Sequence, residues 1–134
     1  MSDEEAVLVE PTSCAIHGID RLEAKAGIEA LVLGAGPSGL VFAQLLKLNG
    51  AARVVIAANK GTKIQVARSL DAADQYVELD RTNPQPQWDQ LKNDNPYGFD
   101  VVVCCMYREA YCNSEPGLFT YSFARRSKSP GQPL

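Results

Sequence analysis

Residues 34–39, GAGPSG, carry the most informative pattern in the chain, because glycines at this spacing can hold phosphate groups. The pattern follows an apolar stretch and precedes a helical one, the context in which G-x-G-x-x-G is typical of a dinucleotide-binding loop. In such a loop the first glycine allows a tight turn, the second leaves room for a pyrophosphate, and the third lets helix and strand pack closely. The alternative is a tight turn that binds nothing. The predicted cofactor-binding loop consists of Gly34, Ala35, Gly36, Pro37, Ser38 and Gly39.

The end of the next apolar stretch indicates which dinucleotide the loop prefers. About 20 residues further on, such proteins usually place an Asp or Glu that binds the adenosine ribose and would repel a 2′-phosphate. Ala58 stands there instead, and Asn59, Lys60 and Lys63 follow with donors and positive charge. The pattern predicts NADP(H) in preference to NAD(H). Two alternatives are that Lys60 and Lys63 are ordinary solvated residues, and that the loop binds a flavin, although flavin-binding modules place a Glu where Ala58 stands.

The elements that must position these residues alternate between strands and helices. Apolar runs predict strands at 29–34, 53–57, 75–79 and 99–103, with helices between them at 38–48, 60–70 and 85–91. This alternation predicts an α/β fold, a Rossmann-type doubly wound parallel sheet with helices on both faces. A further helix is expected over residues 10–23, with Pro11 in its first turn, where proline is well tolerated.

Composition and charge exclude several classes of protein. The chain has 134 residues, 46% of them hydrophobic and 22% charged, which is typical of one globular domain. A net charge of −3 argues against a nucleic-acid partner. No apolar run approaches the roughly 20 residues that cross a membrane. The segment MSDEEAVLVE is too acidic for a targeting peptide, so a cytoplasmic location is expected.

Two stretches, VEPTSCAIHGIDR and ALVLGAGPSGLVFAQLLKLNGAARVV, occur in an order that resembles the medium-chain, zinc-dependent alcohol dehydrogenases, especially the polyol (sorbitol and D-arabitol) dehydrogenases. The resemblance implies an NAD(P)-dependent oxidoreductase that transfers a hydride between a secondary alcohol and the nicotinamide, with a catalytic zinc ion. It implies that Glu10 lies near zinc and substrate in a complete enzyme, and that Ala58 and Lys63 match the ribose-binding positions. It also implies a homo-oligomer, whereas a non-catalytic fragment is expected to pair with a full-length subunit.

The chain departs from this family in its metal ligands. The family's zinc-binding Cys and His-Glu pair have no counterpart here, and the four cysteines form no C-x-x-C pair. Glu10, Cys14 and His17 share one helix face, but three ligands on a single helix cannot easily surround a tetrahedral ion. No metal ligand is therefore predicted. Two readings stay open: the cofactor-binding part of a dehydrogenase, or a catalytically inactive nucleotide-binding fragment or pseudoenzyme.

The domain organisation follows from where the family pattern begins and stops. Residues 1–27 are expected to form a lead-in with the Glu-Pro helix, and residues 28–103 a partial dinucleotide-binding domain, truncated after about four strands. Residues 104–134 lack a sustained period and end in Arg, Lys, Ser, Pro and Gly, which predicts a divergent, disordered tail.

Overall fold

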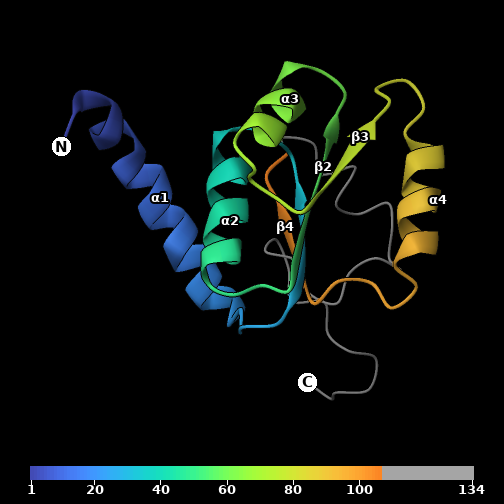
Figure 1. The fold of residues 1–134 in the computed structure, drawn as a ribbon, viewed down its shortest axis with the longest axis horizontal. Helices are drawn as coiled ribbons and strands as arrows, with labels where there is room; N and C mark the ends of the chain where they lie inside the picture. The colour runs from blue at the N-terminus through green and yellow to red at the C-terminus, as the bar shows by residue number, and fades with distance from the viewer. Residues whose placement is uncertain (107–134) are drawn as a thin grey trace, which may run out of the picture.

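The structure, a computed structural model, describes residues 1–106. Its centre is a four-stranded sheet whose neighbouring strands are all parallel. The strands are β1 (Glu29–Leu33), β2 (Arg53–Asn59), β3 (Gln75–Leu79) and β4 (Val101–Cys104). The helices are α1 (Asp3–Leu22), α2 (Pro37–Leu48), α3 (Thr62–Ser69) and α4 (Gln85–Asp94), as Figure 1 shows. The predicted α/β fold with a Rossmann-type parallel sheet is confirmed.

The order of the strands creates a crevice at one place in the sheet. Their order is β3-β2-β1-β4, so the chain steps outward from β1 to β3 and then returns through α4 to the other side of β1. Leu31 of β1 therefore lies between Val55 of β2 and Val102 of β4. In sheets of this kind ligands bind beyond the carboxyl ends of the strands, where the order reverses. Here that place is the end of β1 beside β4.

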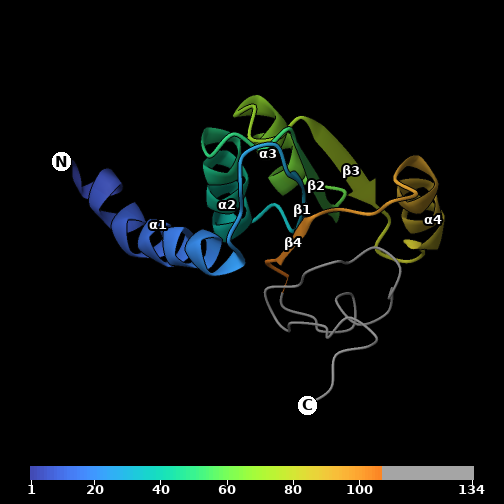
Figure 2. The same cartoon turned by 90° about the horizontal axis from the view of Figure 1, so that it is seen from below.

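Alternating side chains of the strands build a core on each face of the sheet. Ala30 and Val32 of β1 pack into the core that contains the buried residues of α1, α2 and α3. Leu31 and Leu33 point the other way and pack with Trp88 of α4. Figures 1 and 2 show α2 and α3 on one side of the sheet and α4 on the other. The apolar runs of the strands reflect this burial on both faces.

Helix α1 is longer than predicted. It begins at Asp3 because Ser2 Oγ accepts a hydrogen bond from the Glu5 N–H at 3.2 Å, while the Glu5 carboxylate accepts one from the Ser2 N–H at 2.7 Å. This reciprocal cap starts the helix well before residue 10. The predicted place of Pro11 in the first turn is therefore wrong. Pro11 lies inside the helix, where its missing N–H removes one backbone hydrogen bond.

The ordered sheet also extends beyond the predicted boundary at residue 103. Strand β4 includes Cys104, and the Cys105 N–H donates to the Leu33 carbonyl oxygen at 2.8 Å. Residues 104–106, which the sequence prediction assigns to the tail, include the last residue of β4 and the two residues that follow it. The rest of that prediction, residues 107–134, lies outside the described residues. None of the helices in the described part of the chain has the length and apolar character needed to cross a membrane.

Candidate cofactor-binding site

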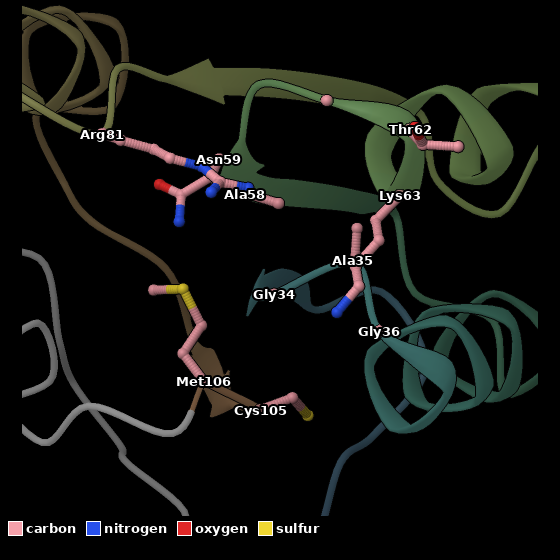
Figure 3. A pocket seen from close by; sticks show the side chains of 11 residues that line it. Gly34, Ala35, Gly36, Ala58, Asn59, Thr62, Lys63, Arg81, Cys105 and Met106 are labelled. Atoms are coloured by element: carbon pink, nitrogen blue, oxygen red, sulfur yellow. The ribbon is translucent and has the colours of Figure 1, made fainter.

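A pocket of about 530 Å³ opens at the carboxyl ends of the strands (Figure 3). Its walls come from the turn after β1, the end of β2, the start of α3, the turn after β3 and the residues after β4. The lining residues are Gly34, Ala35, Gly36, Ala58, Asn59, Gly61, Thr62, Lys63, Arg81, Cys105 and Met106. The pocket thus occupies the edge of the sheet where the strand order reverses, the expected position for a nucleotide in this architecture.

The glycine loop forms one wall of the pocket with its backbone. Gly34 has a φ of +111°, a value that side-chain-bearing residues rarely adopt, and its N–H donates to the Ala57 carbonyl oxygen at 2.8 Å. A Cβ added at Gly36 would meet no atom within 4 Å. Because Gly36 also lines the pocket, this open space is available to a group that approaches the backbone closely. A phosphate is such a group.

Two helices begin at the pocket without a side-chain cap. Gly36 is the N-cap of α2 and Gly61 is the N-cap of α3, and neither helix has an acidic residue in its first turn. The first N–H groups of a helix have no partner within the helix, and the helix dipole places positive charge there. Both helix ends therefore offer donors and positive charge to an anion in the pocket.

Positively charged side chains add to the positive charge that the two helix ends bring to the pocket. Lys63 and Arg81 line the pocket, and its described lining contains no Asp or Glu. Neither cation takes part in any of the ion pairs formed among residues 1–106. In Figure 3 Lys63 extends toward Ala35 and Gly36, whereas Arg81 extends toward Asn59. The pocket is therefore suited to a ligand with negative charge at two places.

The structure brings most of the predicted cofactor-binding residues together. Those that line the pocket are Gly34, Ala35, Gly36, Ala58, Asn59 and Lys63. Pro37, Ser38 and Gly39 form the first turn of α2 behind the lining. Lys60 is exposed and does not line the pocket. Hydrogen bonds from Thr82 and Asn83 lower the pKa of the Asp80 carboxyl, and the nearby charge of Lys60 lowers it slightly further.

Five lining residues were not singled out from the sequence: Gly61, Thr62, Arg81, Cys105 and Met106. A signal for Arg81 exists, because it follows the end of a predicted strand, and the carboxyl ends of neighbouring parallel strands meet at one edge of a sheet. Gly61 and Thr62 fell within the helix predicted from residue 60, which begins at Thr62. Cys105 and Met106 fell within the predicted tail.

The two residues after β4 close the pocket over the glycine loop. A Cβ added at Gly34 would stand 3.1 Å from Met106 Cγ and 3.2 Å from the Cys105 carbonyl oxygen. Burial at this position raises the pKa of the Cys105 thiol to about 11. Cys105 therefore contributes an uncharged, partly buried thiol to this wall of the pocket.

Glu10, which the family resemblance places near zinc, lies outside this pocket. Glu10 is on α1, whose N-terminal half projects away from the sheet (Figures 1 and 2). The Cys14 Sγ donates to Glu10 Oε1 at 3.2 Å, and this contact raises the pKa of Cys14. Within residues 1–106 no group of three or more His, Cys, Asp or Glu side chains could hold a metal ion. The described residues thus do not fit a zinc ion, and no step through zinc is derived from them.

Comparison with known proteins identifies relatives of the chain. No family model matches it. It is 62% identical over 103 residues to D-arabinitol dehydrogenase 1 of Uromyces fabae, an alignment that covers 77% of this chain. It is 37% identical over 107 residues to the sorbitol dehydrogenase of Homo sapiens, covering 80% of this chain. The chain spans about 30% of the length of each of these two relatives.

A solved structure shares both the fold and part of the sequence. This protein, described as a zinc-binding dehydrogenase from Sinorhizobium meliloti 1021 bound to NADP, superposes with a TM-score of 0.64 at 28% identity. The match covers 81% of this chain and 31% of that protein. Sequence and fold therefore agree: over most of its length the chain is similar to a part of zinc-dependent alcohol and polyol dehydrogenases.

Proposed function

We propose that the pocket binds a nicotinamide dinucleotide, preferring NADP(H) to NAD(H), and that the chain is the cofactor-binding part of an oxidoreductase acting on polyols. The observation that carries the proposal is a pocket without carboxylates between the uncapped N-termini of α2 and α3. A dinucleotide with a 2′-phosphate carries negative charge both at its pyrophosphate and at its ribose. The two positively charged helix ends match these two places.

In this proposal, different residues of the chain bind different groups of the cofactor. The loop from Gly34 to Gly39 and the start of α2 hold the pyrophosphate, because Gly36 leaves the backbone accessible. The 2′-phosphate lies toward Asn59, Lys60 and Lys63, where donors and positive charge follow the end of β2. Lys60 acts through its field rather than by contact, since it does not line the pocket. Ala58 contributes by carrying no charge that would repel the phosphate.

The activity of the whole protein is also a proposal. When bound, the nicotinamide supplies hydride transfer to or from a secondary alcohol, and the residues described here bind and orient the cofactor. The polyol substrate class is proposed because the relatives are named arabinitol and sorbitol dehydrogenases. Residues 28–103 would be the cofactor-binding domain and residues 1–27 its lead-in. The exposed apolar residues Val7, Leu8 and Val9 of α1 support packing against a second copy or a full-length subunit.

A titration of the purified 134-residue chain with NADPH and with NADH, followed by nicotinamide fluorescence, tests the proposal. We expect tighter binding of NADPH, and a preference that weakens as salt rises, because screening reduces the attraction of the extra phosphate. The variant Lys63→Gln should lower the affinity for NADPH, whereas Gln65→Ala on the same helix serves as its control. Equal affinities would overturn the preference for NADP(H). A chain with native circular dichroism that binds neither nucleotide would overturn the site itself.

Turnover separates the two readings of the chain. Oxidation of arabitol or sorbitol with reduction of NADP⁺ by the purified chain would support a dehydrogenase. Tight NADPH binding without turnover would support a nucleotide-binding fragment that needs another subunit for catalysis. Adding a full-length related enzyme as a partner and measuring co-elution would then test the pairing directly.

A further inference from the structure

Arg81 lies in the pocket because of the register between β2 and β3. Asn59, at the end of β2, pairs with Leu79 at the end of β3, and the Lys60 N–H donates to the Leu79 carbonyl oxygen at 3.0 Å. The chain after Leu79 therefore starts level with Asn59. Arg81, two residues later, extends toward Asn59 from the wall opposite α3 (Figure 3). The register thus places the side chain of Arg81, from the turn after β3, beside the end of β2.

The turn that carries Arg81 is held by the preceding residue. Asp80 Oδ1 accepts hydrogen bonds from the Thr82 N–H at 2.7 Å, the Thr82 hydroxyl at 2.6 Å and the Asn83 N–H at 3.2 Å. These bonds occupy the carboxylate and lower its pKa, so it stays charged within the turn. Side-chain bonds of this kind fix the backbone of short turns. Asp80 therefore orients the turn without pairing with Arg81, which joins no ion pair among the described residues.

The chemistry of Arg81 suits a phosphate better than that of either lysine. A guanidinium presents a fixed fork of donors that can bind two phosphate oxygens at once, whereas an ammonium acts as a point charge. Lys63 extends toward Ala35 and Gly36, on the side of the glycine loop, and leaves the region beside Asn59 to Arg81. The amide of Asn59 adds a further donor at the same place.

We propose that Arg81 is a specificity-determining residue that binds the 2′-phosphate of NADP(H) together with Asn59. This inference rests on the proposed function, because it assigns a ligand group to the same pocket. It assigns the main charged contact with the 2′-phosphate to a residue after β3, whereas Lys60, after β2, acts only through its charge. Asp80 is then a positioning residue, since it acts only through the turn that presents Arg81.

The test compares Arg81→Gln with Lys60→Gln in the full chain. Both wild-type residues are exposed cations beside Asp80, so each variant removes one positive charge from the same region. We expect Arg81→Gln to weaken NADPH binding about tenfold and to leave NADH within about twofold, since charge-assisted hydrogen bonds are among the stronger ones. Lys60→Gln should change the affinities for NADPH and NADH by no more than about twofold, because this variant keeps the guanidinium of Arg81. Arg81→Lys should fall between wild type and Arg81→Gln for NADPH.

Each outcome decides the proposal. An equal loss of NADPH and NADH in Arg81→Gln would mean that Arg81 packs on the adenine that both share, and would overturn it. A larger NADPH loss in Lys60→Gln than in Arg81→Gln would overturn it as well. A wild-type chain that prefers NADPH and is unaffected by Arg81→Gln would refute this inference alone. A folded wild type that binds neither nucleotide would refute the proposed function and this inference with it. Circular dichroism of each variant confirms that the exposed substitutions leave the fold intact.

Discussion

Gly39 lies so close to Gly34 that a Cβ added at Gly39 would stand 2.0 Å from the Gly34 carbonyl oxygen. Non-bonded carbon atoms normally keep about 3.5 Å from their neighbours, so this space is closed to any side chain. The obstacle is backbone rather than the end of a flexible side chain and cannot move aside alone. The start of α2 reaches the end of β1 only because residue 39 is a glycine, and this contact sets the position of the whole loop.

Gly39→Ala should therefore destabilise the fold. Relieving the clash requires α2 to move away from β1, which disturbs the packing of the buried residue Phe42 on the sheet. We expect a loss of about 1–3 kcal/mol in the free energy of unfolding, the usual range for overpacking. Urea denaturation followed by circular dichroism measures it. A variant within about 0.5 kcal/mol of wild type would show that the two backbones are not in contact in solution.

Gly36→Ala should separate binding from stability in the same loop. Gly36 has a φ of −78°, which alanine adopts freely, and no atom lies within 4 Å of the added Cβ. Replacing such a glycine reduces the entropy of the unfolded chain, so stability should stay equal or rise by up to about 1 kcal/mol. The Cβ would stand where a phosphate has to approach, and NADPH affinity should fall at least about tenfold.

The two glycine variants control each other. Urea curves and NADPH titrations on both should give opposite patterns, with stability lost in Gly39→Ala and affinity lost in Gly36→Ala. A Gly36→Ala chain that binds NADPH as wild type does would place the phosphate away from this loop. That result would leave the fold unchallenged and remove the main support for the cofactor site.

Sequence alone was sufficient for the features that depend on local spacing. The glycine pattern and the apolar runs predicted the positions of the loop, of β3 and of the sheet correctly, because each of these features depends on residues that are close together along the chain. Ala58 and Asn59 were also readable, since the end of β2 lies at a fixed distance from the loop in this kind of unit.

Features that depend on which strands become neighbours were not readable from spacing. Arg81 enters the pocket only because β3 pairs with β2 in a particular register. Lys60 stands one residue from Asn59, yet it lies beside Asp80 and outside the pocket lining. The start of α1 differs from the prediction for another reason: Pro11 favours a helix start near residue 10, but the capping box of Ser2 and Glu5 starts the helix at Asp3.

Ala58→Asp should shift the cofactor preference toward NADH. Ala58 is only 5% exposed and lines the pocket at the end of β2, so a carboxylate there would face the 2′-phosphate with little water between them. Two negative charges at such a distance repel, and the ribose hydroxyls of NADH could instead donate to the new carboxylate. The ratio of NADPH to NADH affinity should fall at least about tenfold.

Ala58→Asn is the matched control for this substitution, because asparagine has nearly the same size and no charge. Fluorescence titrations of both variants with both nucleotides give the two affinity ratios directly. If the asparagine variant lowers the ratio as much as the aspartate variant does, then size at this buried position, not charge, limits NADPH binding. That result would contradict the explanation that the preference for NADP(H) arises from the absence of an acidic residue at position 58.

The partly buried thiol of Cys105 should make stability depend on pH in the alkaline range. Burial raises its pKa from 9.0 to about 11 in the folded chain. Below about pH 9 both states keep the proton and the thiol adds no dependence; between about pH 9 and 11 the unfolded state binds fewer protons, so stability falls as pH rises. With allowance for partial exposure, the loss should be about 1–2 kcal/mol.

Urea denaturation of wild type and Cys105→Ala between about pH 8 and 10.5 measures this loss, because the variant lacks the ionisation of the thiol. The stability of wild type relative to the variant should decline as pH rises, and parallel pH profiles would show instead that the thiol reaches water freely and that the wall over Gly34 is open in solution.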